Sequence, residues 1–419
     1  MSGGRLALMW LCVAASVWCA NGAQAQFGGA VIERYPVQTA NPSCQVVVCR
    51  GGDLFYTAQL LPLDAQGRVV APNDRRLQVD QTFRQLELTL AAAKLKLSDI
   101  VKLNVYCADD DAADAVRKGL PARFPLGLPA VCYVTTSLPH SALVALDAVA
   151  RSPQELAPFD SPRGLAPGVH AEPRRTHWAL SPEGSRVYVA GQAEKGDLRG
   201  ATKGTLQSLE RTLKFLGLEW ADVVQIKSFV TPMSSVAQAE DEFVKFFGEA
   251  TVPPLAWVEW KSDLPIEIEL VASANRGRDS QLVGKPADLE FLTPPGMTTP
   301  TIYSRVVRTH GPTTLFVSGL YGEPGESGEK QVERIFQDLE KTLQLPLADA
   351  GDFRHLAKAT YYVSDDDASG NLNALRPRYY DPQRPPAASK ALVRGVGLPK
   401  ATITIDMIAV PKLPPPKSN

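Results

Sequence analysis

Three stretches of the chain repeat one pattern of apolar positions. Each carries three large apolar residues separated by three and then four positions: Phe83, Leu86 and Leu90; Leu206, Leu209 and Leu213; and Phe336, Leu339 and Leu343. This spacing puts each trio on one face of an α-helix. The Glu and Thr residues near each trio, such as Glu87 and Thr89, are expected on a solvated flank. A single amphipathic helix would explain one trio, but three trios in one register indicate an internal repeat.

Runs of alternating apolar, β-branched and aromatic residues surround each predicted helix and predict strands. One run precedes each helix, one follows it, one ends near a Leu-Pro pair and one closes the unit. They lie at 54–60, 99–111, 130–139 and 142–150 in the first repeat, at 186–192, 222–233, 256–265 and 266–274 in the second, and at 314–320, 355–367, 391–399 and 402–410 in the third. The central leucines of the helices are 123 and 130 residues apart. Periods of this length indicate repeated domains, because solenoid repeats are much shorter.

Pro- and Gly-rich segments separate the repeats. Residues 151–169 and 276–300 are predicted linkers. The chain is therefore expected to hold three α+β domains, which we call unit one (43–150), unit two (170–275) and unit three (301–412). Residues 413–419 are predicted to form an extended, poorly ordered tail.

The first 25 residues have the features of a cleavable signal peptide. Arg5 precedes an apolar run, and Ala23 and Ala25 provide the small residues of a cleavage site. The run is shorter than the ~20 residues that a membrane-spanning helix needs. We expect a secreted or periplasmic protein that is not held in a membrane after cleavage, with an uncleaved anchor as the alternative.

The net charge argues against a nucleic-acid partner, and the cysteine and histidine spacing argues against a metal site. The formal net charge is −1 and no basic run is present, which argues against a nucleic-acid partner. Four of the six cysteines follow the predicted signal, and an exported protein could pair them. We favour buried free thiols for Cys107 and Cys132, which lie in predicted core strands. No Cys/His spacing indicates a metal site, so no metal is expected.

The order of elements resembles the RidA/YjgF family (endoribonuclease L-PSP-like). The similar features are a strand with a small-residue end, a helix, an "IVKLNVY"-type strand, a second helix, a strand ending near Leu-Pro, and an acidic closing strand. The resemblance implies three tandem chorismate-mutase-like domains, each a sheet with two helices on one face. Family members form homotrimers with ligand clefts between subunits. It therefore implies that this chain is a monomer arranged as an internal pseudo-trimer.

The resemblance also implies a chemistry. Active members hydrolyse enamines and imines derived from amino acids, without a cofactor. An Arg grips the substrate carboxylate through a bidentate contact, and a Glu on the closing strand positions water or moves a proton. Counting back from Leu-Pro, the Arg position holds Ala130, Ala256 and Lys390. Anchoring on the preceding Pro gives Val131 and Leu255 in the first two units.

The other family positions are distributed over the units. The closing-strand Glu survives only as Glu267, with Ala145 and Thr404 in the other units, and the helical Asn only as Asn373, with Arg117 and Glu240. Tyr303 matches the family Tyr loosely. We expect Glu267 in a catalytic role, and Lys390, Asn373, Tyr303 and Arg394 in binding a small ligand such as a carboxylate. Arg394 is included because its even spacing from Lys390 predicts a shared strand face.

Two hypotheses follow. The first is an exported hydrolase of the enamine/imine deaminase type, although the family Arg is missing from all three units. The second is a non-catalytic protein that binds a small ligand or acts as a scaffold. Loss of the guanidinium favours the second, and the survival of Glu267, Asn373 and Lys390 favours the first.

Overall fold

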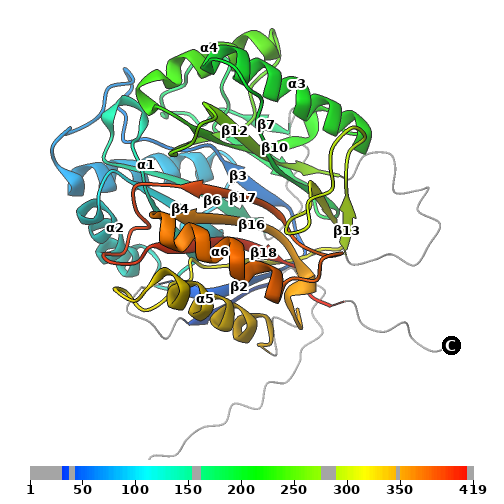
Figure 1. Cartoon of the computed structure of the whole chain (residues 1–419). Coiled ribbons are helices and arrows are strands. Elements are labelled where there is room, and N and C mark those ends of the chain that lie inside the picture. Colours follow the sequence, from blue (N-terminus) through cyan, green and yellow to red (C-terminus); the bar gives the residue numbers. More distant parts are fainter. Residues whose placement is uncertain (1–30, 37–42, 153–161, 275–288, 346–349, 413–419) are drawn as a thin grey trace, which may run out of the picture.

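The computed structural model describes residues 31–36, 43–152, 162–274, 289–345 and 350–412 (Figure 1). The predicted signal peptide and the predicted tail lie outside these residues, as do parts of both predicted linkers. No helix in the described ranges is long and apolar enough to span a membrane.

Six α-helices form in the described residues, two in each unit: α1 (Arg75–Ala91), α2 (Asp110–Arg123), α3 (Leu198–Leu216), α4 (Val236–Phe247), α5 (Gly328–Leu343) and α6 (Asp366–Tyr379). The predicted apolar trios lie on α1, α3 and α5, and every member is at most 2% exposed. Burial of each such side chain contributes about 1.5–3 kcal/mol. The predicted helical repeat is confirmed.

The three threonines near the trios are buried, which corrects the expectation of a solvated flank. Thr89, Thr212 and Thr342 have no exposed surface. Each hydroxyl donates to the carbonyl four residues earlier, at 2.8, 3.3 and 2.7 Å. Because the helix backbone accepts this bond, the hydroxyl is satisfied without water and the Thr methyl group can pack in the interior.

The strands form three six-stranded sheets, each associated with the helices of one unit. In pairing order, the sheet of unit one contains β5 (Ala130–Thr135), β4 (Ile100–Cys107), β6 (Val144–Arg151), β3 (Leu54–Thr57), β8 (Trp178–Ser181) and β7 (Arg163–Gly164). The sheet of unit two contains β11 (Leu255–Glu259), β10 (Val223–Val230), β12 (Ile266–Ser273), β9 (Arg186–Gln192), β14 (Val306–Thr309) and β13 (Leu289–Leu292). The sheet of unit three contains β17 (Ala387–Leu392), β16 (Leu356–Val363), β18 (Ile403–Ala409), β15 (Thr313–Val317), β2 (Cys44–Arg50) and β1 (Val31–Pro36).

Each sheet takes four strands from one unit and a fifth from the beginning of another. The sixth strand, which is β1, β7 or β13, precedes that other unit, and β7 and β13 lie within the predicted linkers. β8 of unit two pairs with β3 of unit one, β14 of unit three pairs with β9 of unit two, and β2 pairs with β15 of unit three. Unit two therefore gives a strand to the sheet of unit one, unit three gives one to the sheet of unit two, and unit one gives one to the sheet of unit three, so the exchange is circular. Between β2 and β3 the chain passes from one sheet to another through Gly51 and Gly52, whose φ angles of 66° and 83° favour glycine.

The helices cover one face of each sheet, and the opposite faces pack against one another (Figure 1). One apolar cluster on these inner faces joins residues from all three units, among them Tyr56, Tyr188 and Phe316. The architecture is α+β with three domains of the expected type. Because the inner faces are shared, each unit completes its core only against the other two.

Two local features complete the fold, and the second confirms the prediction of buried free thiols for Cys107 and Cys132. The Asp-rich stretches after β4 and β16 begin helices, because Asp109 and Asp365 accept hydrogen bonds from the amides of Ala112 and Ala368. All four cysteines that follow the predicted signal are free and buried. Burial raises the pKa of the Cys44 and Cys49 thiols to about 11, so these thiols are held in their unreactive form.

Candidate functional site

Two of the predicted site residues, Lys390 and Asn373, meet in unit three. Lys390 lies on β17 and its side chain points toward α6. Its Nζ donates to Ser369 Oγ at 2.9 Å and to Asn373 Oδ1 at 3.4 Å. Lys390 is half-buried and Asn373 is exposed, so the contact is open to solvent on the side of the amide.

A second cation, Arg376, lies beside this pair. Its Nη2 donates to Asn373 Oδ1 at 3.1 Å, and its guanidinium lies 5.0 Å from the centre of the Tyr361 ring. Arg376 is only 4% exposed, and its Nε has no hydrogen-bond partner in the described part of the chain. Arg376 is not among the residues expected from the sequence. Its position three residues after Asn373, on the same helical face, is the signal that could have found it.

The cluster of Ser369, Asn373, Arg376 and Lys390 is positively charged, and we call it the cation cluster. Among the described residues, no carboxylate lies within ion-pair distance of either cation. Burial, together with the nearby charge of Arg376, lowers the pKa of Lys390 below its ordinary value of 10.5. The two like charges share one neutral acceptor, the Asn373 amide oxygen.

Glu267 lies on β12 of unit two and faces unit three. Its carboxyl group accepts a hydrogen bond from Ser389 of β17. Gly191 packs directly against this carboxyl group, so that any side chain at Gly191 would collide with it. Burial, and then the nearby charge of Glu269, raise the pKa of Glu267 to about 7. Both the protonated and the ionised form of Glu267 are therefore populated near neutral pH.

Glu267 and Lys390 are not in contact with each other. Glu267 bonds to Ser389, whereas the next residue along β17, Lys390, bonds to α6. Successive side chains of a strand point to opposite faces. The structure thus brings Lys390 and Asn373 together on one face of β17. Glu267, from β12, lies against the opposite face of that strand.

The other two predicted binding residues lie apart from the cation cluster. Tyr303 is partly buried against two core clusters, and its ring lies 5.3 Å from the Arg305 guanidinium. Arg394 follows the end of β17 and donates to Ala108 O at 3.3 Å and to Ser137 Oγ at 2.6 Å. Arg394 therefore does not share a strand face with Lys390, because β17 ends at Leu392 and the chain turns toward units one and two.

The strand register revises the alignment of the units. Lys390 lies opposite Tyr361, and the same level in the other sheets holds Tyr133 and Trp257. The count from Leu-Pro had instead matched Lys390 to Ala130 and Ala256. The count failed because the loops before Leu-Pro differ in length. Counting from the preceding Pro instead aligns Val131 and Leu255. The register places these two residues and Ala388 at equivalent positions of their sheets.

A cavity of about 80 Å³ lies between units one and two. Its lining includes Gln59 of unit one, Trp257, Arg175 and Glu240 of unit two, and three histidines, which are His140, His170 and His177. This volume holds a few water molecules or a small organic group.

An ion pair occupies the wall of this cavity. Arg175 Nη2 lies 2.6 Å from Glu240 Oε1, and both side chains are about three-quarters buried. Glu240 stands at the helical position that Asn373 holds in unit three. Arg175 is not among the residues expected from the sequence, because it lies in an irregular segment and no local pattern of residues distinguishes it.

His177 and His170 of the cavity differ in their hydrogen bonds and in their exposure. His177 Nδ1 accepts from Ala166 N at 2.9 Å, and its Nε2 lies 2.9 Å from His170 O. Burial lowers the pKa of His177 below its ordinary value. His170 Nε2 lies 3.7 Å from Glu172 Oε1. His177 is thus a neutral structural residue, while the side chains of His170 and Glu172 are more exposed. No group of three or more His, Cys, Asp or Glu in the described ranges could hold a metal ion.

Comparison with known proteins is consistent with this architecture. The model of the family described as Endoribonuclease L-PSP matches residues 36–152 and 177–274. The chain is 28% identical over 101 residues to the RutC family protein PH0854 of Pyrococcus horikoshii, a match that covers 21% of this chain and 79% of that relative.

Two solved structures are each similar to less than a third of this chain. The YjgF gene product of E. coli is 27% identical, with 28% of this chain and 93% of that chain covered and a TM-score of 0.22. The YjgF-family protein NMB1025 of Neisseria meningitidis is 23% identical, with 30% and 98% covered and a TM-score of 0.22. The family model covers about half of the chain. The chain therefore belongs to the Endoribonuclease L-PSP family, the YjgF/RidA group.

Proposed function

We propose that the protein binds a small, amino-acid-derived carboxylate at the cation cluster of unit three. The observation that carries this proposal is that Lys390 and Arg376 share one neutral acceptor, the Asn373 amide, and contact no carboxylate among the described residues. A largely buried cation without a counter-charge is unfavourable. A ligand carboxylate would supply that counter-charge.

The exposure of the residues suggests how the ligand enters. Asn373 is exposed, Lys390 is half-buried and Arg376 is buried. A carboxylate that arrives on the Asn373 side meets the ammonium first, and it can then displace the weak 3.4 Å contact between Lys390 and Asn373. Charge-assisted hydrogen bonds of this kind are about twice as strong as neutral ones.

The family resemblance narrows the class of ligand. Relatives of the enamine/imine deaminase type act on 2-imino and 2-enamino acids and release 2-oxo acids. Short-chain 2-oxo acids such as 2-oxobutanoate are therefore the first ligands to test.

Hydrolysis is the second candidate function, and Glu267 favours it. A carboxyl group with a pKa of about 7 can both donate and accept a proton at neutral pH. In the reaction, water adds to the imine carbon, the carbon–nitrogen bond breaks, and the nitrogen leaves as ammonia after protonation. Glu267 would have to act through Ser389 or a water molecule, because Lys390 faces the other side of β17.

Calorimetry tests the binding proposal. Wild-type protein should bind 2-oxobutanoate, and Lys390→Ala should weaken binding by about 10-fold or more. Lys203→Ala, which removes an exposed lysine of α3, is the control and should bind as the wild type does. Equal binding by Lys390→Ala would exclude the cation cluster, and absence of binding in the wild type would favour the scaffold alternative.

Ammonia release tests the hydrolytic candidate. The protein would be incubated with enzymatically generated 2-aminoacrylate, and the rate compared with that of Glu267→Gln. Release above the spontaneous rate that disappears in Glu267→Gln supports hydrolysis. Binding of 2-oxobutanoate without ammonia release leaves binding as the function.

We also propose that the single chain replaces a three-subunit assembly and is monomeric. The circular strand exchange supports this, because it covers the inner sheet faces within one chain. Light scattering of the chain without residues 1–25 should give the mass of one chain. A stable trimer of whole chains would contradict the proposal.

A further inference from the structure

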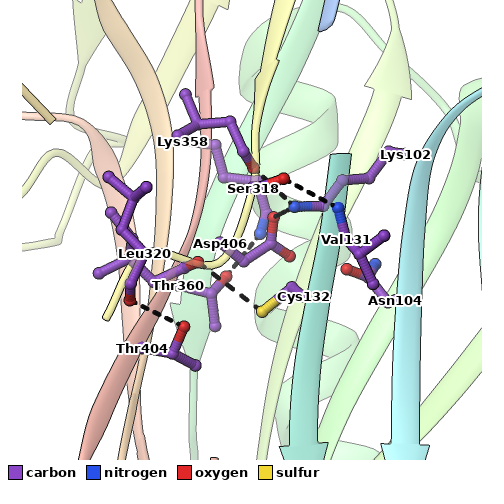
Figure 2. Close-up of polar contacts among 12 residues, drawn as sticks. Lys102, Asn104, Val131, Cys132, Ser318, Leu320, Lys358, Thr360, Thr404 and Asp406 are labelled. Atoms are coloured by element: carbon purple, nitrogen blue, oxygen red, sulfur yellow. Dashed lines mark hydrogen bonds and ion pairs between the residues drawn. The ribbon is translucent and has the colours of Figure 1, made fainter. Parts of the chain in front are cut away.

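Three lysines lie in the interior where the inner faces of the three sheets meet, and each contacts a carboxylate. Lys102 Nζ lies 3.0 Å from Asp406 Oδ1, and Lys227 Nζ lies 3.3 Å from Asp406 Oδ2. Lys358 Nζ lies 2.9 Å from Glu269 Oε1. Figure 2 shows Lys102, Lys358 and Asp406 in this interior. A neighbouring carboxylate stabilises the ammonium form, so these three lysines are held as cations and not as nucleophiles.

Lys390 differs from these lysines because its hydrogen-bond acceptors are neutral. In the described part of the chain they are Ser369 Oγ at 2.9 Å and Asn373 Oδ1 at 3.4 Å. Burial, and then the charge of Arg376, lower the pKa of Lys390, so more of its amine is free at a given pH than in an ordinary lysine. A lysine that is partly desolvated beside another cation is the kind that proteins use as a nucleophile.

Lys390 and Arg376 lie around one oxygen atom. Asn373 Oδ1 is 3.4 Å from Lys390 Nζ and 3.1 Å from Arg376 Nη2. A ligand carboxylate that binds beside Arg376 therefore lies next to Lys390 Nζ as well. In a 2-oxo acid the carbonyl carbon is bonded directly to the carboxyl carbon, so it comes within reach of the same amine. Holding two reacting atoms about 3–3.5 Å apart speeds their reaction strongly, even when only a small share of the amine is unprotonated.

We propose that Lys390 forms a Schiff base with the carbonyl carbon of a bound 2-oxo acid. The inference rests on the carboxylate binding proposed for the cation cluster and adds a covalent step to it. Arg376 holds the ligand carboxylate in this arrangement, and the iminium that forms on Lys390 keeps a positive charge beside it. The ligand class is thereby narrowed to carboxylates that carry a carbonyl group next to the carboxylate.

The covalent step balances without a cofactor. The ammonium of Lys390 first gives a proton to water, and the nitrogen lone pair then forms a bond to the carbonyl carbon. The carbonyl oxygen takes up protons and leaves as water while the carbon–nitrogen bond becomes double. Overall, an ammonium and a carbonyl give an iminium and water, so neither the charge nor the number of bound protons changes. Addition of water in the reverse direction releases the 2-oxo acid.

Borohydride trapping tests the proposal. The full chain is incubated with 2-oxobutanoate and then treated with sodium borohydride, which reduces the carbon–nitrogen double bond to a stable secondary amine. Mass spectrometry should show one reduced ligand per chain, and peptide mapping should place it on Lys390. The adduct at Lys390 should exceed that at Lys203, an exposed lysine of α3, by about 10-fold. Equal labelling of the two lysines, or no adduct, would overturn the proposal.

Lys390→Arg separates the covalent step from binding. The guanidinium keeps the positive charge but does not form a Schiff base, so calorimetry should still detect 2-oxobutanoate while the trapped adduct disappears. Butanoate, which lacks the carbonyl group, should leave no adduct on the wild type. Binding that Lys390→Ala weakens, together with no adduct in the wild type, would refute the Schiff base and leave the proposed function intact. Absence of both binding and adduct would refute both.

Oxygen exchange tests the same step without a reductant. Each round of Schiff-base formation and hydrolysis replaces the carbonyl oxygen of the ligand with an oxygen from water. In water enriched in a heavy oxygen isotope, the wild-type protein should label 2-oxobutanoate about 10-fold faster than Lys390→Arg does. The same rate for both proteins would contradict the proposal.

Discussion

Units two and three place different partners beside a cation at the same level of the second helix. In unit two, Glu240 pairs with Arg175 at 2.6 Å. In unit three, Asn373 stands in place of Glu240, and its amide oxygen is shared by Lys390 and Arg376. A built-in carboxylate neutralises its cation, whereas an amide leaves the cation available. This difference is why we assign carboxylate binding to unit three and not to the cavity between units one and two.

The largest expected effect is on stability and concerns Glu267, whose position in unit one is held by Ala145. The folded protein raises the pKa of Glu267 from 4.5 to about 7. The folded state therefore holds this proton more tightly than the unfolded state, and stability is lost as pH rises from about 4.5 to about 7. The loss amounts to about 3 kcal/mol.

Glu267→Gln should remove this loss and raise the free energy of unfolding at pH 8 by about 3 kcal/mol relative to the wild type. Denaturant unfolding at pH 5 and pH 8 measures it. Glu340→Gln, at an exposed position of α5, should leave the pH dependence unchanged. If Glu267→Gln keeps the wild-type pH dependence, its carboxyl group does not hold the proton as described.

Asn373→Asp should convert unit three to the arrangement of unit two. The new carboxylate would pair with Lys390 and Arg376 and compete with the ligand, so affinity for 2-oxobutanoate should fall by about 10- to 100-fold. Asn371→Asp adds the same charge to α6 two residues earlier and serves as the control. Calorimetry that gives equal losses for both variants would indicate a general charge effect and would break the comparison.

Glu240→Gln makes the converse change in unit two. It frees Arg175 and should raise carboxylate affinity in the cavity by about 10-fold. The measurement uses Lys390→Ala as background, so that only the cavity contributes. Asp241→Asn, which removes the neighbouring charge on α4, is the matched control. If Glu240→Gln binds no better than its background, then the Arg175–Glu240 pair does not decide which site takes the ligand.

The smallest expected effect is the pH dependence of binding. Only the ammonium form of Lys390 attracts a carboxylate, and the pKa of Lys390 is lowered from 10.5 by burial and Arg376. Affinity should therefore fall as pH rises toward that lowered pKa, before an ordinary lysine would titrate. Lys390→Arg should bind with constant affinity up to pH 10, because a guanidinium stays charged. Parallel pH profiles for the two proteins would assign the titration to another group.

Periodicity predicted most of the fold. The spacing of Leu86, Leu209 and Leu339 from the other two apolar residues of each trio predicts which helix face is buried. The strand exchange could not be predicted, because residues such as Val47 are buried whether β2 pairs within its unit or with β15. The buried threonines were missed because a hydroxyl that bonds to its own helix leaves no trace in the pattern.

The site was predicted in part. Lys390 and Asn373 were identified from the resemblance, and the structure brings them together. Arg376 was missed because an arginine on a polar helix is normally solvated, and its burial depends on packing against Tyr361 of β16. Lys102 and Asp406 alternate with apolar residues and so resemble a polar sheet face. Only the packing of three sheets shows that this face is covered.

A crystal structure of the full chain with 2-oxobutanoate tests the central claim most directly. We expect the ligand carboxylate about 3 Å from Lys390 Nζ, with an oxygen directed toward Arg376 and the Arg175–Glu240 pair intact. A carboxylate found only in the cavity between units one and two, with the Arg175–Glu240 pair broken and the cation cluster without ligand, would contradict the account.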